Sequence, residues 1–350
     1  MRVIKIGVIG LGEVSQAHIA AIAALPQAKL VSVCDAAPKV VARVAAETGA
    51  VPFTDPADLL RAGGIDLVLV LTPCATHRQI VAQAAAAGID VFCEKPLALT
   101  VEDGEAMVTG CKAAGVRLFY GSCYRYLPAV RAAKAMIDQD RIGRIQLMSE
   151  TVIGGRGPAG YRQLSPVHYP VGGPGGSGMS LIDHGIHLID VFAWFTGEQS
   201  ISAVGKAQIS GAPADSEYLL LTYPSGATGH LLYNNATFSA ALPNEGMFTG
   251  GSAWTTEGGL VTGGGWLNDP GCITVWGSKG VLRIFHYANV LYANVGDGPQ
   301  RIALEGRASL GHFTTQLEAC LLAIVEDRAP DLPGEIGLAA LRSLLPVYRQ

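Results

Sequence analysis

Hydrophobic positions in the first third of the chain alternate between short apolar runs and longer segments of helical spacing. Residues 3–9 (VIKIGVI) form a β-branched run, and the alanine- and isoleucine-rich segment after them is typical of a helix. Further apolar runs cover residues 29–35, 66–73, 90–96 and 116–121, and segments of helical spacing lie between them. Strands and helices that alternate in this way predict a doubly wound parallel sheet.

After residue 121 the pattern changes to that of a mainly antiparallel sheet. A helix is expected near residues 128–139, and the strands that follow are predicted at 144–153, 201–210, 216–223, 227–235, 272–278 and 280–287. Two glycine-rich stretches, 154–178 and 246–271, are too long for hairpin turns and are expected to be loops that cover a site. Two closing helices are expected within residues 311–350. We therefore expect an α/β fold in two domains, 1–122 and 123–350, with the closing helices packing back.

Composition narrows the class of protein. The 350 residues are 49% hydrophobic, enough for two buried cores, and the net charge of −4 gives no basic surface for nucleic acid. No apolar run approaches the roughly 20 residues that span a bilayer. The seven cysteines are odd in number and contain no paired C-x-x-C, so we expect neither disulfides nor a zinc cluster. These features predict a cytoplasmic protein that binds no membrane.

The turn after the first strand has the features of a nucleotide site. Gly10 and Gly12 stand where the strand passes into a helix, so bare backbone and the helix N-terminus could hold a pyrophosphate. Ser15 takes the third fingerprint position, which is usually Gly or Ala. Asp35 ends the second strand, where a carboxylate accepts hydrogen bonds from a ribose and repels a 2′-phosphate. NAD is therefore favoured over NADP, although Lys39 lies near enough to pair with a phosphate.

Residues 180–190 (SLIDHGIHLID) place acids and histidines in an otherwise apolar helix. Asp183, His187 and Asp190 fall on one stripe of a regular helix, so each needs a partner or a task if the helix is buried. The residues leave three interpretations open: a core histidine satisfied by a carboxylate, a metal site, or catalysis. His184 fits a structural role, and Asp190 is expected to anchor the helix to neighbouring backbone.

At GVIGLGEVSQAH, LTPCATH, GIDVFCEKPLA and GMSLIDHGIHLID the chain resembles the Gfo/Idh/MocA family of sugar and cyclitol dehydrogenases, which includes relatives of glucose–fructose oxidoreductase and myo-inositol dehydrogenase. The resemblance implies a Rossmann domain at 1–122 and a substrate-binding and oligomerisation domain with an open sheet at 123–350. It implies a catalytic trio of Lys95, Asp183 and His187, with no metal. His187 would be the base, Lys95 would stabilise the charge on the reacting oxygen, and Asp183 would orient the imidazole or bind a second hydroxyl. Glu94 would hold the cofactor or serve as an ion-pair partner.

The remaining expected contacts divide between cofactor and substrate. The residues expected at the cofactor are Gly10, Leu11, Gly12, Glu13, Val14, Asp35, Thr72, Pro73, His77, Glu94, Lys95 and Arg125. His77 is alternatively a surface helix residue. Those expected at the substrate are Lys95, Tyr126, Arg156, Tyr161, Arg162, His168, Asp183 and His187. The arginines of the glycine-rich loop are typical either of an acidic sugar site or of a solvated loop.

The expected activity is hydride transfer between NAD and a secondary hydroxyl of a sugar or cyclitol. Two alternatives stay open: an enzyme that retains its NAD and cleaves or rearranges a glycoside through transient oxidation, and a regulator that binds a nucleotide without catalysis. The open sheet also leads us to expect a homodimer or homotetramer.

Overall fold

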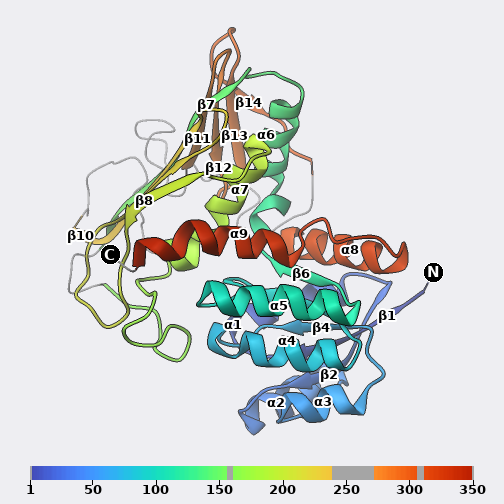
Figure 1. Ribbon diagram of the computed structural model, residues 1–350. Helices are drawn as coiled ribbons and strands as arrows, with labels where there is room; N and C mark the ends of the chain where they lie inside the picture. Colours follow the sequence, from blue (N-terminus) through green and yellow to red (C-terminus); the bar gives the residue numbers. More distant parts are fainter. Residues whose placement is uncertain (1, 156–160, 239–271, 306–310, 349–350) are drawn as a thin grey trace. The chain divides into compact units, whose positions relative to one another are not determined.

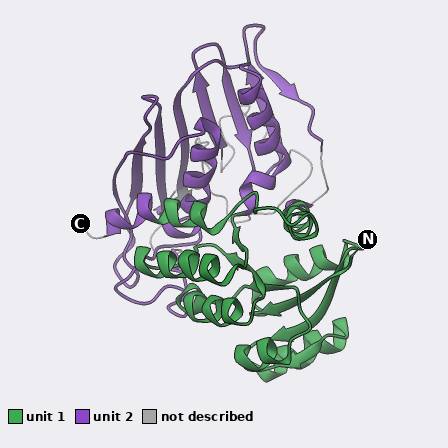
Figure 2. Ribbon diagram, turned by 45° about the vertical axis from the view of Figure 1, so that its right-hand side comes forward, with its two compact units in different colours: residues 1–122, 313–341 green, residues 123–312, 342–350 purple. Residues whose placement is uncertain are grey.

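The computed structural model describes residues 2–155, 161–238, 272–305 and 311–348. The chain divides into two compact units, which Figure 2 colours separately. Unit 1 contains residues 1–122 and 313–341, and unit 2 contains residues 123–312 and 342–350. A segment near the C-terminus thus belongs to the same unit as the N-terminal third. Among the described residues no helix has the length and apolar character needed to cross a bilayer.

Unit 1 is built on a six-stranded parallel sheet in the order β3-β2-β1-β4-β5-β6. The strands are β1 (Ile4–Ile9), β2 (Ala28–Cys34), β3 (Val51–Phe53), β4 (Leu67–Val70), β5 (Asp90–Glu94) and β6 (Leu118–Gly121). The helices between them are α1 (Glu13–Ala23), α2 (Pro38–Thr48), α3 (Pro56–Ala62), α4 (His77–Ala86) and α5 (Val101–Ala114). The strand order reverses between β1 and β4, which is where doubly wound sheets bind ligands.

The apolar runs of the sequence become the centre of this sheet. Every residue of β4 is fully buried, and β1 is buried except at Lys5. Strands covered on both faces read as continuous hydrophobic runs, which is why these strands were predicted. The edge strand β3 was not predicted, because its three residues are exposed or half-buried and include a proline. Helix α3 was not predicted either.

Helix α8 (Gly311–Val325) and the first part of α9 (Gly334–Leu344) complete unit 1 (Figure 1). The segment between them pairs with β6: the Tyr120 N–H donates to Leu332 O at 2.9 Å, and Phe119 bridges to Pro333. Phe313 lies edge-on to His18 of α1, with ring centroids 5.0 Å apart.

Unit 2 is built on an eight-stranded sheet in the order β14-β13-β12-β11-β7-β10-β9-β8. The strands are β7 (Ile145–Gly155), β8 (Ser202–Lys206), β9 (Glu217–Thr222), β10 (Thr228–Phe238), β11 (Cys272–Gly277), β12 (Val281–Phe285), β13 (Val290–Asn294) and β14 (Gln300–Ile302). Neighbouring strands are antiparallel except β7 and β10, which run parallel. The fold class expected from the sequence is therefore confirmed.

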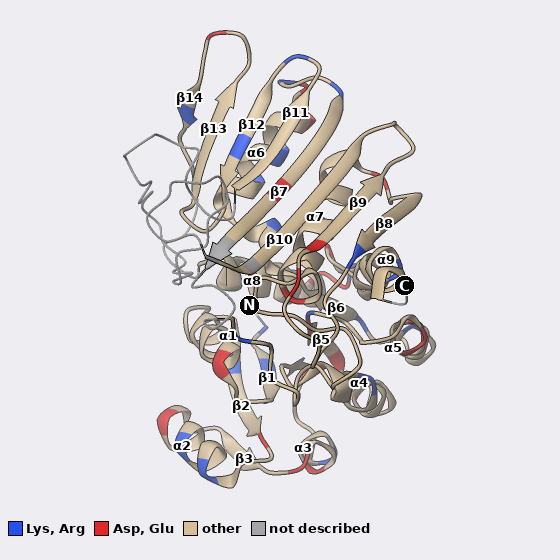
Figure 3. Ribbon diagram, turned by 90° about the vertical axis from the view of Figure 1, so that its left-hand side faces the viewer, with Lys and Arg blue, Asp and Glu red and all other residues tan. Residues whose placement is uncertain are grey.

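Helices α6 (Pro128–Asp138) and α7 (Ile186–Thr196) lie on the same face of this sheet (Figures 1 and 3). Short helical segments precede each of them: the 3-10 turn η2 (Cys123–Tyr126) and the π-helical turn η4 (Leu181–Gly185). Figure 3 shows charged residues of both signs distributed over both units.

One strand of unit 2 differs from the expectation. The strand expected at 201–210 stops at Lys206, and the residues after it form a loop. The glycine-rich stretch 246–271 lies outside the described residues, as do residues 156–160 of the stretch 154–178.

Candidate active site

The turn between β1 and α1 leaves an open helix N-terminus. Gly10 has φ +96°, and a Cβ there would lie 2.6 Å from the Leu71 carbonyl carbon, so only glycine fits. Gly12, the N-cap of α1, has open space where its Cβ would be, and no side chain caps the helix. The first N–H groups of α1 and its positive dipole end are therefore available to an anion.

Asp35 stands beside this turn with its carboxylate fixed. Oδ2 accepts the Leu11 N–H at 2.8 Å, and Oδ1 accepts the Ala37 N–H at 2.9 Å. The residue is half-buried, while Lys39 on α2 is exposed. The negative charge is thus held at the carboxyl end of β2, next to the glycine turn.

The loops after β4 and β5 are joined by His77. Its ring nitrogens face Thr72 O at 2.9 Å and Leu97 O at 3.2 Å, and its side chain is buried rather than on the surface. Burial lowers the pKa of His77, so a neutral ring donates to one of these carbonyls. Thr72 and Pro73 are half-buried at the start of the same loop, where Thr76 Oγ1 contacts Thr72 Oγ1 at 2.8 Å.

Glu94 fixes the backbone that carries Lys95. One carboxylate oxygen lies 2.8 Å from His18 Nε2, and the other accepts the Lys95 N–H at 3.0 Å. His18 and Glu94 are both buried, whereas Lys95 is half-buried. This contact places His18 beside Glu94, and both roles expected of Glu94 stay predictions. His18 has no signal in the sequence that would identify it, since it lies 76 positions before Glu94.

In unit 2, Asp183 and His187 are held by two tyrosines. The Tyr169 hydroxyl donates to Asp183 Oδ1 at 2.9 Å. The Tyr124 ring stacks on the His187 ring, with centroids 4.1 Å apart and planes inclined by 2°. Asp183 is half-buried and His187 is buried. Tyr169 belongs to the glycine-rich stretch 154–178 and Tyr124 to η2, and no sequence pattern connects either to these residues.

The expected single stripe of polar residues is interrupted by the π-helical turn. Asp183 lies in η4, whereas His187 and Asp190 lie on α7, so regular helical spacing applies only to the last two. Asp190 does anchor the helix, but to a side chain: its Oδ1 accepts Arg125 Nε at 2.9 Å. The Arg125 guanidinium also lies 5.3 Å from the ring centroid of Trp194.

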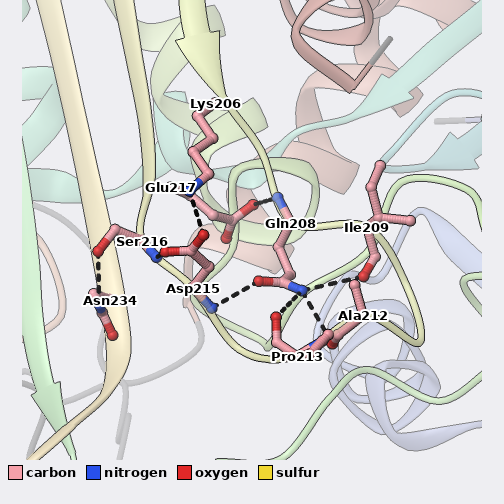
Figure 4. Close-up of polar contacts among 9 residues, drawn as sticks. All are labelled: Lys206, Gln208, Ile209, Ala212, Pro213, Asp215, Ser216, Glu217 and Asn234. Atoms are coloured by element: carbon pink, nitrogen blue, oxygen red, sulfur yellow. Dashed lines mark hydrogen bonds and ion pairs between the residues drawn. The ribbon is translucent and has the colours of Figure 1, made fainter. Parts of the chain in front are cut away.

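The glycine segment before η4 is braced by the loop between β8 and β9. The Gly175 N–H donates to Gln208 O at 3.1 Å, and the Ser210 N–H donates to Gly173 O at 2.9 Å. Figure 4 shows the Gln208 side chain inside this loop, where Nε2 donates to Pro213 O at 2.8 Å and Oε1 accepts the Asp215 N–H at 2.9 Å.

Glu217, the first residue of β9, connects the same loop to η4. Its Oε1 accepts the Gln208 N–H at 2.9 Å, and its carboxyl group also accepts the N–H of Leu181, the first residue of η4. The side chain is buried, and burial raises its pKa to about 8 despite these two donors. This loop and its glutamate position the turn that carries Asp183.

The other expected contact residues are distributed as follows. Leu11 is buried, Val14, Tyr126 and Tyr161 are half-buried, and Glu13, Arg162 and His168 are exposed. Burial raises the pKa of Tyr161 to about 12. Arg156 lies outside the described residues. His184, expected to be structural, is buried within a polar network that includes Glu150 of β7.

Comparison with known families and proteins adds to this geometry. Residues 4–122 match the model of an oxidoreductase family with an NAD-binding Rossmann fold, GFO_IDH_MocA, and residues 130–283 match the GFO/IDH/MocA C-terminal domain. The chain is 32% identical to scyllo-inositol 2-dehydrogenase (NAD(+)) of Bacillus subtilis over 65% of its length, which covers 66% of that protein. It is 31% identical to D-apiose dehydrogenase of Paraburkholderia graminis over 64% of its length, and this match covers 58% of that protein. The matches thus span less than two thirds of these two relatives.

Solved structures resemble the whole chain. The WlbA dehydrogenase from Bordetella pertussis, in complex with NADH and UDP-GlcNAcA, superposes with a TM-score of 0.73 at 26% identity, covering 99% of this chain and 96% of that one. The aldose-aldose oxidoreductase from Caulobacter crescentus superposes with a TM-score of 0.77 at 24% identity, covering 99% and 97%. The second likeness concerns the fold alone.

Proposed function

Since the chain belongs to the GFO/IDH/MocA oxidoreductase family, we propose that it is an NAD-dependent dehydrogenase acting on a secondary hydroxyl of a sugar or cyclitol. The observation that carries the proposal is the turn at Gly10 and Gly12, which leaves the α1 N-terminus uncapped and open. This turn fits a dinucleotide pyrophosphate, because backbone N–H groups and the helix dipole bind phosphate without a cationic side chain. Sugar and cyclitol substrates are suggested by the names of the relatives.

We propose NAD rather than NADP as the cofactor. Asp35 is fixed by two backbone N–H groups at the end of β2, where it would accept hydrogen bonds from the ribose hydroxyls. The same charge would repel a 2′-phosphate. Thr72, Pro73 and the Glu94–Lys95 backbone follow the carboxyl ends of β4 and β5, and they would complete the nucleotide site.

The proposed chemistry uses three side chains. Bound NAD would supply the hydride acceptor at its nicotinamide ring. His187 would accept the proton of the substrate hydroxyl at an imidazole nitrogen, and Lys95 would stabilise the negative charge that grows on that oxygen. Asp183, oriented by the Tyr169 hydroxyl, would accept a hydrogen bond from the imidazole or a neighbouring substrate hydroxyl. Tyr126, Tyr161, Arg162, His168 and Arg156 are proposed to contact the rest of the substrate.

We also propose a cytoplasmic homo-oligomer. All seven cysteines are buried thiols, as in proteins of a reducing compartment. Val204 of β8 and Leu220 of β9 are paired across the strands and are 55% and 42% exposed, so this sheet face has an apolar surface to offer a second copy. Light scattering tests the assembly, and a monomer at all concentrations would contradict it.

A spectrophotometric panel tests the activity. The purified protein is assayed with sugars, uronates and inositols against NAD and NADP, after a check for retained nucleotide. We expect NADH formation with at least one polyol. His187→Ala should reduce turnover at least about 100-fold and leave the dissociation constant of NAD within about twofold. His230→Ala, which alters an exposed histidine of β10, is the matched control and should keep full activity. Equal loss of NAD binding and turnover in His187→Ala would contradict the assigned role.

A further inference from the structure

A buried chain of polar side chains ends on the ring that covers His187. Tyr124 comes from η2 and His187 from α7, yet their rings are parallel and in contact. The residue after Tyr124 makes the second link between the two elements, because Arg125 pairs with Asp190 one turn beyond His187. Tyr124 and Arg125, which are adjacent in η2, therefore contact two successive turns of α7.

The hydroxyl of Tyr124 is itself held in place. It lies 3.0 Å from His184 Nδ1 and 2.9 Å from the Tyr287 hydroxyl, and Tyr287 lies 2.9 Å from the same nitrogen. Burial raises the pKa of both tyrosines, so both hydroxyls keep their protons. The three groups form a closed triangle in which the Tyr124 ring has a fixed plane.

The triangle is anchored to the sheet by Glu150 in β7. Glu150 Oε2 lies 2.7 Å from His184 Nε2 and accepts the Tyr233 hydroxyl at 2.7 Å, and Oε1 lies 3.5 Å from His286 Nε2. Burial alone would raise the pKa of Glu150, but the imidazoles of His184 and His286 and the Tyr233 hydroxyl together lower it. Since an ionised carboxylate only accepts, His184 Nε2 carries the proton that it donates to Glu150.

The same residues have to be weighed as a metal site. Glu150, His184 and His286 each offer a ligand atom, all within 4.8 Å of one another. Tetrahedral zinc, with bonds of about 2.0–2.1 Å, separates its ligand atoms by about 3.3 Å. The 2.7 Å between Glu150 Oε2 and His184 Nε2 is a hydrogen-bond length instead. The distances therefore favour a hydrogen-bonded chain over a metal centre.

We propose that Tyr124 is a positioning residue that fixes the imidazole plane of His187 for proton transfer. Glu150 holds Tyr124 in place through His184. This inference rests on the proposed function of His187 as the base. It assigns to His184 and Glu150 a task that they carry out through Tyr124.

Kinetics of paired variants test the inference. Tyr124→Leu removes the stacked ring and should lower kcat about 10- to 100-fold, with KM and NAD affinity within about twofold, because a misplaced base costs rate and not binding. Tyr124→Phe keeps the ring and should recover most of this loss. Glu150→Gln keeps the shape but removes the carboxylate charge and replaces one acceptor oxygen with an NH2 donor, and it should lower kcat about tenfold.

Tyr233→Phe is the matched control, because it removes a hydrogen bond to the same buried carboxylate outside the chain to Tyr124. It should lower the melting temperature as Glu150→Gln does, but keep kcat within about twofold. The inference is wrong if Tyr124→Leu changes kcat no more than this control, if its loss lies in KM, or if the purified protein holds a stoichiometric transition metal. A wild-type protein that turns over while His187→Ala does so equally well would instead contradict the proposed function.

A second measurement needs no turnover. In protein labelled at histidine, the ring signal of His187 is identified by its absence in His187→Ala. We expect one sharp signal in the wild type and in Tyr233→Phe, and a shifted or doubled signal in Tyr124→Leu, because the ring current and the packing of Tyr124 are lost. An unchanged signal in Tyr124→Leu would overturn the inference even if no substrate were found.

Discussion

Glu217 shows how one buried acid can set the pH dependence of stability. Its carboxyl group accepts the N–H groups of Gln208 and Leu181, but it is buried, and its pKa rises from 4.5 to about 8. A group whose pKa is higher in the folded state binds its proton more tightly there. Its contribution to folding is then fully present below pH 4.5 and is lost as the pH rises towards 8.

We predict that this loss is visible in thermal unfolding. Between pH 5 and pH 8 the wild-type protein should lose stability relative to Glu217→Gln, by up to about 1.4 kcal/mol per pH unit, and the difference should level off above pH 8. Melting temperatures of the two proteins across this range measure it. Melting temperatures of the two proteins that change in parallel with pH would show that Glu217 is ionised throughout. Asp215→Asn, which alters an exposed residue of the same loop, provides the control.

Single residues also mark how far the sequence predicts the candidate site. Asp183 and His187 stand out because polar residues in an apolar helix need a reason, and their pattern is local. Tyr124 and Glu150 have no such signal, because they contact His184 across 60 and 34 positions of sequence. Only the pairing of β7 with its neighbours and the packing of η2 on α7 bring them together.

At the scale of elements, the turn between β1 and α1 uses its two glycines for different reasons. Gly10 is required by the fold, since its φ is positive and a Cβ would meet the backbone of Leu71 and Thr72. Gly12 has an ordinary φ of −70° and open space beside it. The fold does not require glycine at this position, so the missing side chain serves a ligand that approaches the helix N-terminus.

We predict that the two substitutions separate stability from binding. Gly10→Ala should destabilise the protein by more than about 2 kcal/mol, from backbone strain and the clash with Leu71. Gly12→Ala should leave the melting temperature nearly unchanged and weaken NAD binding at least about tenfold, because its methyl group occupies the approach of the pyrophosphate. Thermal melts and NAD titrations measure both. Tight NAD binding by a stable Gly12→Ala protein would contradict the placement of the phosphates.

The elements that the sequence predicts are those with a continuous hydrophobic pattern. The buried strands β1, β4 and β5 were found because both faces are covered, whereas β3, β13 and β14 are short edge or near-edge strands with little pattern. The helix of residues 180–190 was predicted as regular, but it begins with the π-helical turn η4. Such a turn depends on tertiary support, here the Glu217 contact at Leu181, which sequence periodicity does not encode.

At the scale of the whole molecule, unit 1 is not continuous in sequence. Residues 313–341 supply contacts to the edge strand β6: Leu332 O accepts the Tyr120 N–H, and a Cβ at Gly334 would lie 2.5 Å from the Leu118 side chain. Arg117 on the same edge donates to Arg328 O at 3.0 Å. The sequence indicated closing helices that pack back, but the match of residue to residue at this edge required the structure.

We therefore predict that residues 1–122 do not form a stable unit alone. Without 313–341, the edge of β6 loses its hydrogen-bonded partner, and Tyr120 and Phe119, both buried in the intact unit, are exposed. The isolated 1–122 fragment should unfold with low cooperativity and bind NAD weakly. A fusion of 1–122 to 311–344 through a flexible linker should unfold cooperatively and recover NAD binding. Circular dichroism melts and NAD titrations compare the two, and equal melting temperatures would show that β6 needs no cover. Equal NAD affinity in the two proteins would mean that the nucleotide site is complete within 1–122, so the titration decides whether the C-terminal segment is part of the cofactor-binding unit or only packs against it.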